Sequence, residues 1–280
     1  MLTQDTMKHF KIFRNPFIND VQGPKDVFLN EDGRYVLAAM KDVARNQGIL
    51  AVTGDSGAGK SVLRKLFLEE LKRDGDVSAI QLKIIDKSRA TAAGICDAII
   101  NDISSENPKR SMEAKARQVE RLLMDAHQAG QRHVLVIEEA HDLSVPVMKY
   151  LKRFWELEDG FSKLLGILLI GQTELEAKLD ERKNYALREF IRRCMVVSIP
   201  PYDHDMFEYL THKFDRGGLE LDKIFTKDAI EAMRRKLSLS RSGTGSRVYP
   251  QMINNVVTRA MNFAASLDED KVTVEIVEEL

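Results

Sequence analysis

The octapeptide GDSGAGKS at residues 54–61 constrains the fold more than any other stretch of this chain. It fits the pattern G-x-x-x-x-G-K-[ST], and it lies between the apolar run ILAV and the helical pattern VLRKLFLEEL. Glycines let such a loop curl so that its backbone N–H groups point at an anion, and the next helix adds its positive dipole end. The pattern therefore predicts a phosphate-binding loop between a strand and a helix.

The loop predicts ATP and Mg²⁺ as cofactors. Lys60 is expected to reach the β- and γ-phosphates, and the hydroxyl of Ser61 is expected to contact Mg²⁺. The other residues expected to line the phosphates are Gly54, Asp55, Ser56, Gly57, Ala58, Gly59 and Val62. A glycine-rich turn that contains Lys-Ser by chance is the alternative, and the flanking strand and helix patterns disfavour it.

Strand and helix patterns alternate after the loop. Helices are predicted at about 60–72, 90–103, 111–129 and 146–158, and strands at 77–85, 133–141, 164–171 and 194–199. This alternation predicts a parallel sheet with right-handed crossovers, which ends at Pro200-Pro201. The segments 203–214, 226–237 and 249–266 then predict a second, all-helical domain, with a Ser/Gly-rich loop at 237–247. The tail KVTVEIVEEL fits a strand or a helix.

Composition narrows the class of protein. An apolar content of 44 % and a charged content of 30 % are typical of soluble globular proteins. The longest apolar run, at 164–171, is too short to cross a bilayer, and the N-terminus has no signal-peptide core. Two lone cysteines, Cys96 and Cys194, suggest a reducing compartment and fit small core positions. We therefore expect a cytoplasmic protein without a membrane partner.

Two further strands are followed by polar residues. Glu138 and Glu139 come directly after the apolar run VLVI, where one acid can hold Mg²⁺ through water and the next can orient the attacking water. We assign Glu138 to the metal and Glu139 to catalysis. Gln172 and Thr173 follow the run at 164–171, and Gln172 is the residue chosen to position the water or the γ-phosphate. Thr173 fits the N-cap of a helix equally well.

Six segments, in this order, resemble the AAA+ ATPase branch that includes ExeA-type secretion ATPases and transposition regulators of the TniB, TnsC and phage Mu B kind. They are FRNPF, GDSGAGKS, LVIEEAHDL, LLIGQTEL, REFIRRCMVVSIPP and PQMINNVVTRA, which together span nearly the whole chain. The resemblance implies an α/β P-loop AAA+ fold, in which a five-stranded parallel sheet with helices on both faces precedes a small helical lid. The expected domains are an N-terminal extension (1–45), a nucleotide-binding core (46–201) and the lid (202–280).

The resemblance also implies that an arginine of one subunit completes the ATP site of its neighbour. Arg193 is assigned this role, with Arg192 as the near alternative; capping of a helix or pairing with Glu189 is the other interpretation. Relatives often carry Pro-Arg at the start of the last lid helix, whereas this chain has Pro250-Gln251. Either Arg247 substitutes for the missing charge or the lid senses nucleotide weakly, so Arg247 and Gln251 both count as nucleotide-contacting candidates.

The implied function is an ATP-dependent DNA-binding ATPase that oligomerises on target DNA, as a ring or a helical filament, and recruits or activates a transposase. The alternative is an ExeA-type secretion-associated ATPase, or a nucleotide switch with no DNA role. ExeA-type proteins usually continue into a membrane span and a periplasmic domain, and this chain ends at residue 280 without either, which favours the first expectation. The location implied is the cytoplasm of a bacterium, or of the host for a phage-encoded protein.

Basic residues suggest where DNA would bind, although the net charge of −1 does not itself indicate nucleic-acid binding. The resemblance favours Lys149, Lys152 and Arg153 on one helix face, or Lys109 and Arg110 in a loop. Residues 226–262 contain seven Lys/Arg against two acids, which is a local net charge of +5. A solvated basic surface explains that excess equally well. Contacts of this kind would hold phosphates without reading the base sequence.

Overall fold

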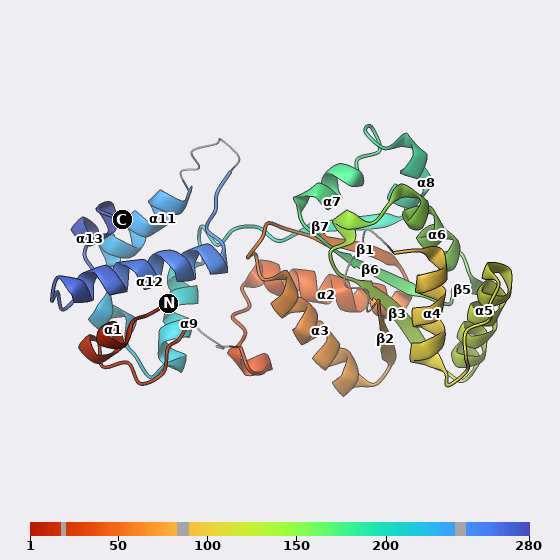
Figure 1. Cartoon of the computed structure of the whole chain (residues 1–280), viewed down its shortest axis with the longest axis horizontal. Coiled ribbons are helices and arrows are strands. Elements are labelled where there is room, and N and C mark those ends of the chain that lie inside the picture. Colours follow the sequence, from red (N-terminus) through yellow and green to blue (C-terminus); the bar gives the residue numbers. More distant parts are fainter. Residues whose placement is uncertain (18–20, 83–89, 239–244) are drawn as a thin grey trace. The chain divides into compact units, whose positions relative to one another are not determined.

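The computed structural model describes residues 1–17, 21–82, 90–238 and 245–280, and it divides the chain into two compact units (Figure 1). The sheet unit consists of residues 31–56 and 63–199. The helical unit consists of residues 1–30, 57–62 and 200–280. The end of the strand expected at 77–85, part of the loop expected at 237–247 and one of the seven basic residues, Arg241, fall outside the described residues.

The sheet unit is built on five parallel strands in the order β2-β3-β6-β1-β7. The strands are β1 (Ile49–Thr53), β2 (Val77–Gln81), β3 (Arg132–Ile137), β6 (Gly166–Ile170) and β7 (Cys194–Ser198). Every residue of β1 and β6 is buried, as expected for central strands of a parallel sheet covered on both faces. The predicted α/β P-loop fold is confirmed, and the strand expected at 133–141 ends earlier, at Ile137.

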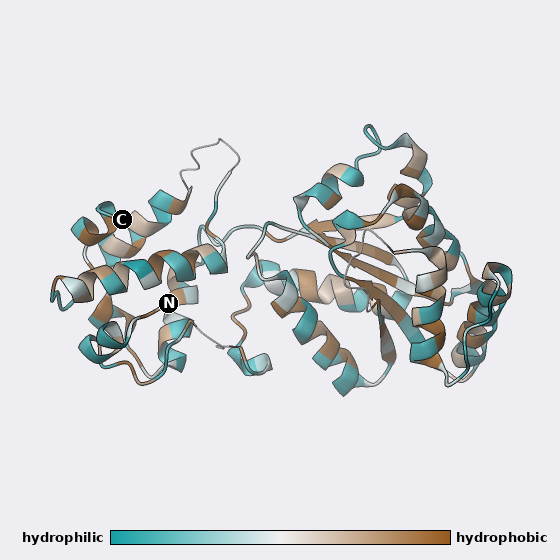
Figure 2. Cartoon of the chain, viewed as in Figure 1, coloured by the Kyte–Doolittle hydropathy of each residue, from teal (hydrophilic) through white to brown (hydrophobic). Residues whose placement is uncertain are grey.

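Helices cover both faces of the sheet because successive strand residues point to opposite sides. Residues Leu135 and Ile137 of β3 join a core formed with α4 (Ala92–Ile103), α5 (Met112–Gln128) and α6 (Val145–Trp155). Helix α2 (Glu31–Asn46) packs on β1, β3 and β6, with α3 (Lys60–Asp74) beside it. Figure 2 shows the strands as the most hydrophobic elements. Cys96 lies in the core, and burial raises the pKa of its thiol to about 11.

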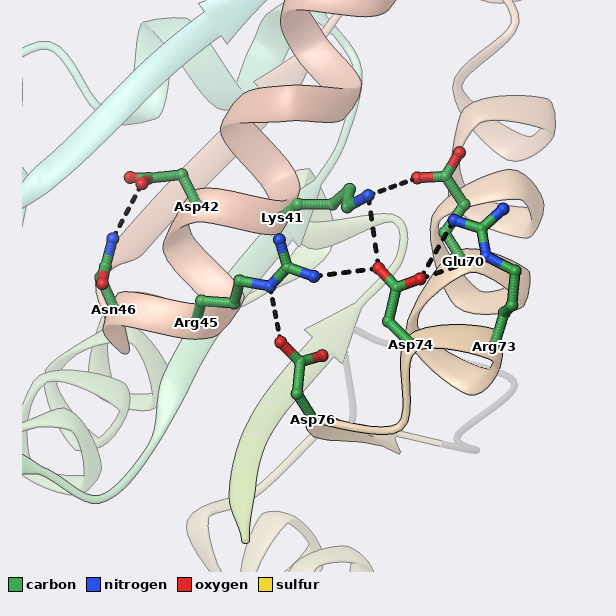
Figure 3. Close-up of polar contacts among 8 residues, drawn as sticks. All are labelled: Lys41, Asp42, Arg45, Asn46, Glu70, Arg73, Asp74 and Asp76. Atoms are coloured by element: carbon green, nitrogen blue, oxygen red, sulfur yellow. Dashed lines mark hydrogen bonds and ion pairs between the residues drawn. The ribbon is translucent and has the colours of Figure 1, made fainter. Parts of the chain in front are cut away.

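A group of ion pairs fastens α2 to α3 and to the start of β2 (Figure 3). Lys41 Nζ lies 2.8 Å from Glu70 Oε2 and 3.5 Å from Asp74 Oδ2. Arg45 reaches Asp74 with Nη2 at 2.9 Å and Asp76 with Nε at 2.6 Å. The carboxyl end of α3, the helix that follows the phosphate loop, is thereby held to its neighbour on the sheet.

The region between α6 and β7 differs from the sequence expectation. Helix α6 ends at Trp155 rather than at 158, and a short hairpin of β4 (Glu158–Asp159) and β5 (Ser162–Lys163) follows. Asp159 pairs with Ser162, so Gly160 and Phe161 form the turn, and Gly160 has φ +60°, a positive value that glycine adopts readily in a two-residue hairpin turn and that a helix does not contain. Beyond β6 come three short helices, α7 (Thr173–Lys178), η4 (Tyr185–Leu187) and α8 (Arg188–Ile191).

The helical unit has a separate hydrophobic core. Its elements are α1 (Gln4–His9), η1 (Pro24–Asp26), α9 (Met206–Arg216), α10 (Leu221–Ile224), α11 (Lys227–Ser238), α12 (Pro250–Ser266) and α13 (Val274–Glu278). The tail that fitted two structures forms one bridge, between Val272 and Phe225, and then the helix α13. None of the helices in the described ranges combines the length and apolar character that a bilayer crossing requires.

Candidate active site

Three polar segments leave the same edge of the sheet. Parallel strands end at a common carboxyl edge, and β6 lies between β1 and β3. The phosphate loop begins at Gly54 after β1, the paired acids follow β3, and Gln172 follows β6. Ligands of open α/β sheets bind at this edge. The strand order, which local sequence patterns do not predict, therefore brings these candidates to one edge of the sheet.

Two glycines of the loop have left-handed backbone conformations. Gly57 has φ +81° and Gly59 has φ +97°, values that residues with a side chain rarely adopt. Around Gly59 nothing would contact an added Cβ, so glycine is needed there for its backbone alone. Lys60 and Ser61 lie in the first turn of the 15-residue helix α3. These features fit the phosphates of a nucleotide with Mg²⁺.

The catalytic candidate Glu139 has an unusual backbone. It follows Glu138 at the end of β3 with φ +50° and ψ +39°, in the left-handed region, and it is the N-cap of η3 (Ala140–Asp142). A residue with a side chain loses roughly 1–3 kcal/mol in such a conformation, and this kind of strain is concentrated at functional sites. The side chain of Glu139 is 55 % exposed, so water can reach its carboxylate.

Glu138, the metal candidate, contacts a cation from α3. Arg64 Nε lies 2.9 Å from Glu138 Oε2, although the N–H is not aligned with that oxygen, so the contact is an ion pair rather than a hydrogen bond. Arg64 also donates a long hydrogen bond of 3.4 Å to Gln81 at the end of β2. Among the described residues, no group of three or more His, Cys, Asp or Glu could hold a metal ion.

Gln172 lies at the N-terminus of α7 rather than inside a loop. The helix begins at Thr173 and Gln172 is its N-cap, so the alternative in which Thr173 caps the helix is wrong. The backbone N–H of Gln172 donates to Nδ1 of His141 at 3.3 Å. The sequence analysis did not select His141, because its partner lies on another element, 31 residues away. The sequence signal that could have identified His141 is its position two residues after Glu139, the candidate catalytic acid.

The two arginine candidates have different contacts. Arg192 forms an ion pair with Glu181, with Nη2 at 2.6 Å from Oε1. Arg193 donates to the backbone oxygen of Glu189 at 2.8 Å, and its guanidinium carbon lies 5.9 Å from the centre of the Trp155 ring. Both guanidinium groups belong to exposed residues. The hydrogen bond from Arg193 to a carbonyl in the last turn of α8 agrees with the alternative interpretation in which this arginine caps a helix.

The three basic residues of α6 face the η4–α8 segment. Lys149, Lys152 and Arg153 line a pocket of about 320 Å³ together with residues 185–190. Lys152 is paired with Glu189 and lies 3.2 Å from Glu156, so its charge is already balanced. Lys149 is exposed and has no ion-pair partner among the described residues, while Arg153 stacks on the Tyr150 ring at 5.0 Å.

The loop candidates Lys109 and Arg110 are both exposed. Their loop, between α4 and α5, is ordered by the buried Gln118, which accepts from the Lys109 N–H at 3.1 Å and donates to Glu106 at 2.8 Å.

In the helical unit, Arg247 is exposed, and its backbone N–H donates to Leu237 at 3.1 Å. Gln251 is the second residue of α12, and its N–H points to the Gly57 oxygen at 3.4 Å.

Comparisons with known proteins agree with this geometry. Residues 43–179 match the family model of the AAA domain. The sheet unit has the P-loop AAA+ fold.

Among curated proteins, General secretion pathway protein A of Aeromonas hydrophila is 25 % identical over 252 residues, which are 89 % of this chain. The match covers 43 % of that relative, so the chain spans less than half of its length.

Solved structures show the same fold at low identity. Cdc6p of Pyrobaculum aerophilum aligns with TM-score 0.59 and 14 % identity, over 92 % of this chain and 67 % of its own. ORC2 of Aeropyrum pernix, in ADPNP–ADP complexes, aligns with TM-score 0.58 and 13 % identity, over 95 % and 70 %. The RuvB Holliday junction branch migration motor of Thermotoga maritima aligns with TM-score 0.54 and 15 % identity, over 95 % and 72 %.

Proposed function

We propose that the chain binds ATP with Mg²⁺ and hydrolyses it at the carboxyl edge of the sheet. Lys60 and the loop N–H groups hold the phosphates, and Ser61 and one oxygen of Glu138 hold the hydrated metal. Mg²⁺ supplies charge neutralisation at the phosphates when bound. Glu139 orients the attacking water, and Gln172 faces the same edge. The left-handed conformation of Glu139 is the observation that carries this proposal, because it places a strained acid where water can reach it.

Hydrolysis is proposed to require a neighbouring subunit. Phosphoryl transfer builds charge on the γ-phosphate, and an arginine supplied in trans accelerates it by roughly 10³-fold or more. Arg193 is the better candidate for this role, because Arg192 already forms an ion pair with Glu181. Among the described residues, Arg193 donates to a carbonyl and lies over the face of Trp155, and both are weaker partners than a carboxylate in a direct ion pair.

Duplex DNA is the proposed partner of the assembled ATPase, and recruitment of a transposase is the role that the sequence resemblance adds. Two observations support DNA binding. Lys149 and Arg153 are exposed cations on one helix, and the fold is similar to that of RuvB, a Holliday junction branch migration motor. A few phosphate contacts per subunit are weak, but a row of subunits adds them. Binding should therefore depend on ATP and rise steeply with protein concentration.

The test is an anisotropy titration of labelled duplex DNA with ATP, with ADP and without nucleotide. Lys149→Ala/Arg153→Ala should lower the log–log salt slope by about 1.8, from roughly 0.9 per phosphate contact for two contacts, and leave ATP affinity unchanged. The matched control is Lys65→Ala/Lys72→Ala, which removes two exposed charges from α3. Equal and negligible DNA binding in all three nucleotide states would overturn the DNA proposal.

A secretion-associated ATPase is the second candidate, and the similarity to General secretion pathway protein A favours it. This candidate, like a nucleotide switch, predicts nucleotide-dependent assembly and hydrolysis with no retention of DNA. The same titration separates the candidates, because all of them share the ATP site and differ in the partner.

A further inference from the structure

We propose that His141 is a positioning residue for ATP hydrolysis, which links the carboxylate of Glu139 to the backbone of Gln172. The inference rests on the proposed catalytic role of Glu139 and extends it to a residue that contacts neither phosphate nor metal. Three sets of contacts in the sheet unit carry it: those of the imidazole ring, those of the His141 backbone, and the close packing at Gly171.

The two ring nitrogens of His141 have different partners. Nδ1 accepts the N–H of Gln172 at 3.3 Å, and a neutral imidazole that accepts at one nitrogen carries its proton on the other. Nε2 therefore carries the hydrogen, and it lies 3.6 Å from Glu139 Oε2 and 3.8 Å from Asp142 Oδ1. At these distances the N–H attracts both carboxylates without forming a full hydrogen bond. The ring is 14 % exposed, so water screens this attraction only partly.

The backbone around His141 is fastened to α7 independently of the ring. Lys178, at the end of α7, donates to the backbone oxygens of His141 and, at 2.9 Å, of Leu143. The hydroxyl of Thr53, the last residue of β1, donates to Glu176 of the same helix. Helix α7 thus holds both the end of β1 and the turn that carries the acids.

Gly171 allows the two segments to approach closely. A Cβ at this position would lie 3.2 Å from the backbone nitrogen of His141 and 2.9 Å from Leu175 Cδ2. The turn after β3 and the turn after β6 are therefore packed against each other without space for a methyl group. As a consequence, the orientation of the His141 ring follows the position of Gln172, and the ring transmits that orientation to Glu139.

The link matters because Glu139 needs an external restraint. Its backbone is strained, and its side chain is more than half exposed, so rotation of the carboxylate costs little unless a neighbour opposes it. A carboxylate that orients water must keep one direction during the reaction. The Nε2–H of His141 supplies that direction, and losing it should lower kcat while leaving the KM for ATP unchanged.

Two substitutions separate the two nitrogens. In His141→Asn the side-chain oxygen is as far from the backbone as Nδ1, so it still accepts from Gln172 but does not reach Glu139. In His141→Gln the side-chain nitrogen is as far from the backbone as Nε2, so it still donates toward Glu139 but leaves the Gln172 N–H without its acceptor. We expect His141→Asn to lower kcat by about 10-fold or more, which is the loss that follows when a catalytic group is misplaced. The KM for ATP and the stability of this variant should equal those of the wild type. His141→Gln should keep kcat within a few-fold and unfold at lower urea concentration.

A merely structural role for His141 predicts the opposite ranking, in which the less stable variant is also the less active one. That ranking, or a rise of kcat in His141→Asn, would overturn the proposal. A Glu139→Asp background provides the second measurement, because the shorter acid is already out of reach of Nε2. His141→Asn should then cost no further activity, and an undiminished loss would show that His141 acts elsewhere. Wild-type hydrolysis by Glu139→Gln would instead refute the proposed function itself.

Discussion

Replacing Gly171 with alanine tests whether the turns after β3 and β6 are as tightly packed as the structure indicates. The new Cβ would lie 2.9 Å from Leu175 Cδ2, 3.1 Å from Leu175 Cβ and 3.2 Å from the His141 nitrogen. Rotation of Leu175 relieves only the first contact, because the other two involve a Cβ and a backbone atom. The turns must then separate by a few tenths of an ångström. Overpacking of this kind destabilises a fold by about 1–3 kcal/mol.

Urea unfolding of the full chain measures this loss, and Gly48→Ala is the matched control. At Gly48 the nearest atom to an added Cβ is Val43 Cγ2 at 3.5 Å, an ordinary contact. Its stability should be unchanged or raised by up to about 1 kcal/mol through the unfolded chain. Gly171→Ala should also melt about 2–12 °C lower, at 2–4 °C per kcal/mol for a unit of this size. Equal stability of the two variants would refute the packing argument.

Burial lowers the pKa of Lys213 to about 8, so stability should rise with pH between about 8 and 10, where the unfolded chain binds more protons. Lys213→Met should abolish this rise and stabilise the fold by up to about 3 kcal/mol at pH 7, at 1.36 kcal/mol per pKa unit. Urea unfolding of the variant at several pH values measures both effects, and a rise in stability that persists in the variant would contradict the role of Lys213. The hydrogen bond from Arg73 lowers the pKa of Asp74. Ionised Asp74 therefore contributes to the free energy of unfolding above pH 3.8, and this contribution is lost as pH falls through the lower pKa of the folded state. Acid titration of Asp74→Asn should therefore show lower stability at neutral pH and a shallower loss below pH 4, and an unchanged acid profile would argue against the ion pairs. Mixing inactive Arg193→Ala with inactive Glu139→Gln should restore part of the ATPase rate, whereas no recovery in mixtures shown to assemble would count against a shared site.

Local patterns in the sequence were sufficient for the five strands of the sheet, for the longer helices after residue 60 and for the site loop. The alternation of strands and helices after residue 54 follows from apolar periodicity, and the Gly-Lys-Ser loop is defined by backbone needs that few residues meet. The order β2-β3-β6-β1-β7 depends instead on which strands pair across long separations, which no local pattern encodes. Helix α2 was not predicted, although its buried Val36, Met40 and Val43 have helical spacing, because residues 1–45 were treated as an extension.

The contacts that distinguish candidate residues could not be predicted from sequence. Lys152 was grouped with its basic neighbours, but its charge is balanced by Glu189, which is 37 residues away. Arg64 was not considered, and its pairing with Glu138 depends on how α3 lies over the end of β3. Both contacts arise from the packing of helices on the sheet, which fixes side chains that are distant in sequence next to each other.

The chain contains one tryptophan, and its position gives the protein an internal optical reporter. The Trp155 indole N–H is held by the backbone oxygen of Gln47 at 2.7 Å, while Lys163 and Arg193 lie over its ring at 4.7 Å and 5.9 Å. Fluorescence excited at the red edge of the protein absorption band therefore comes from one indole flanked by two cations. Any event that draws the Arg193 guanidinium away from the ring changes the field at the indole, so the unlabelled chain reports that movement in real time.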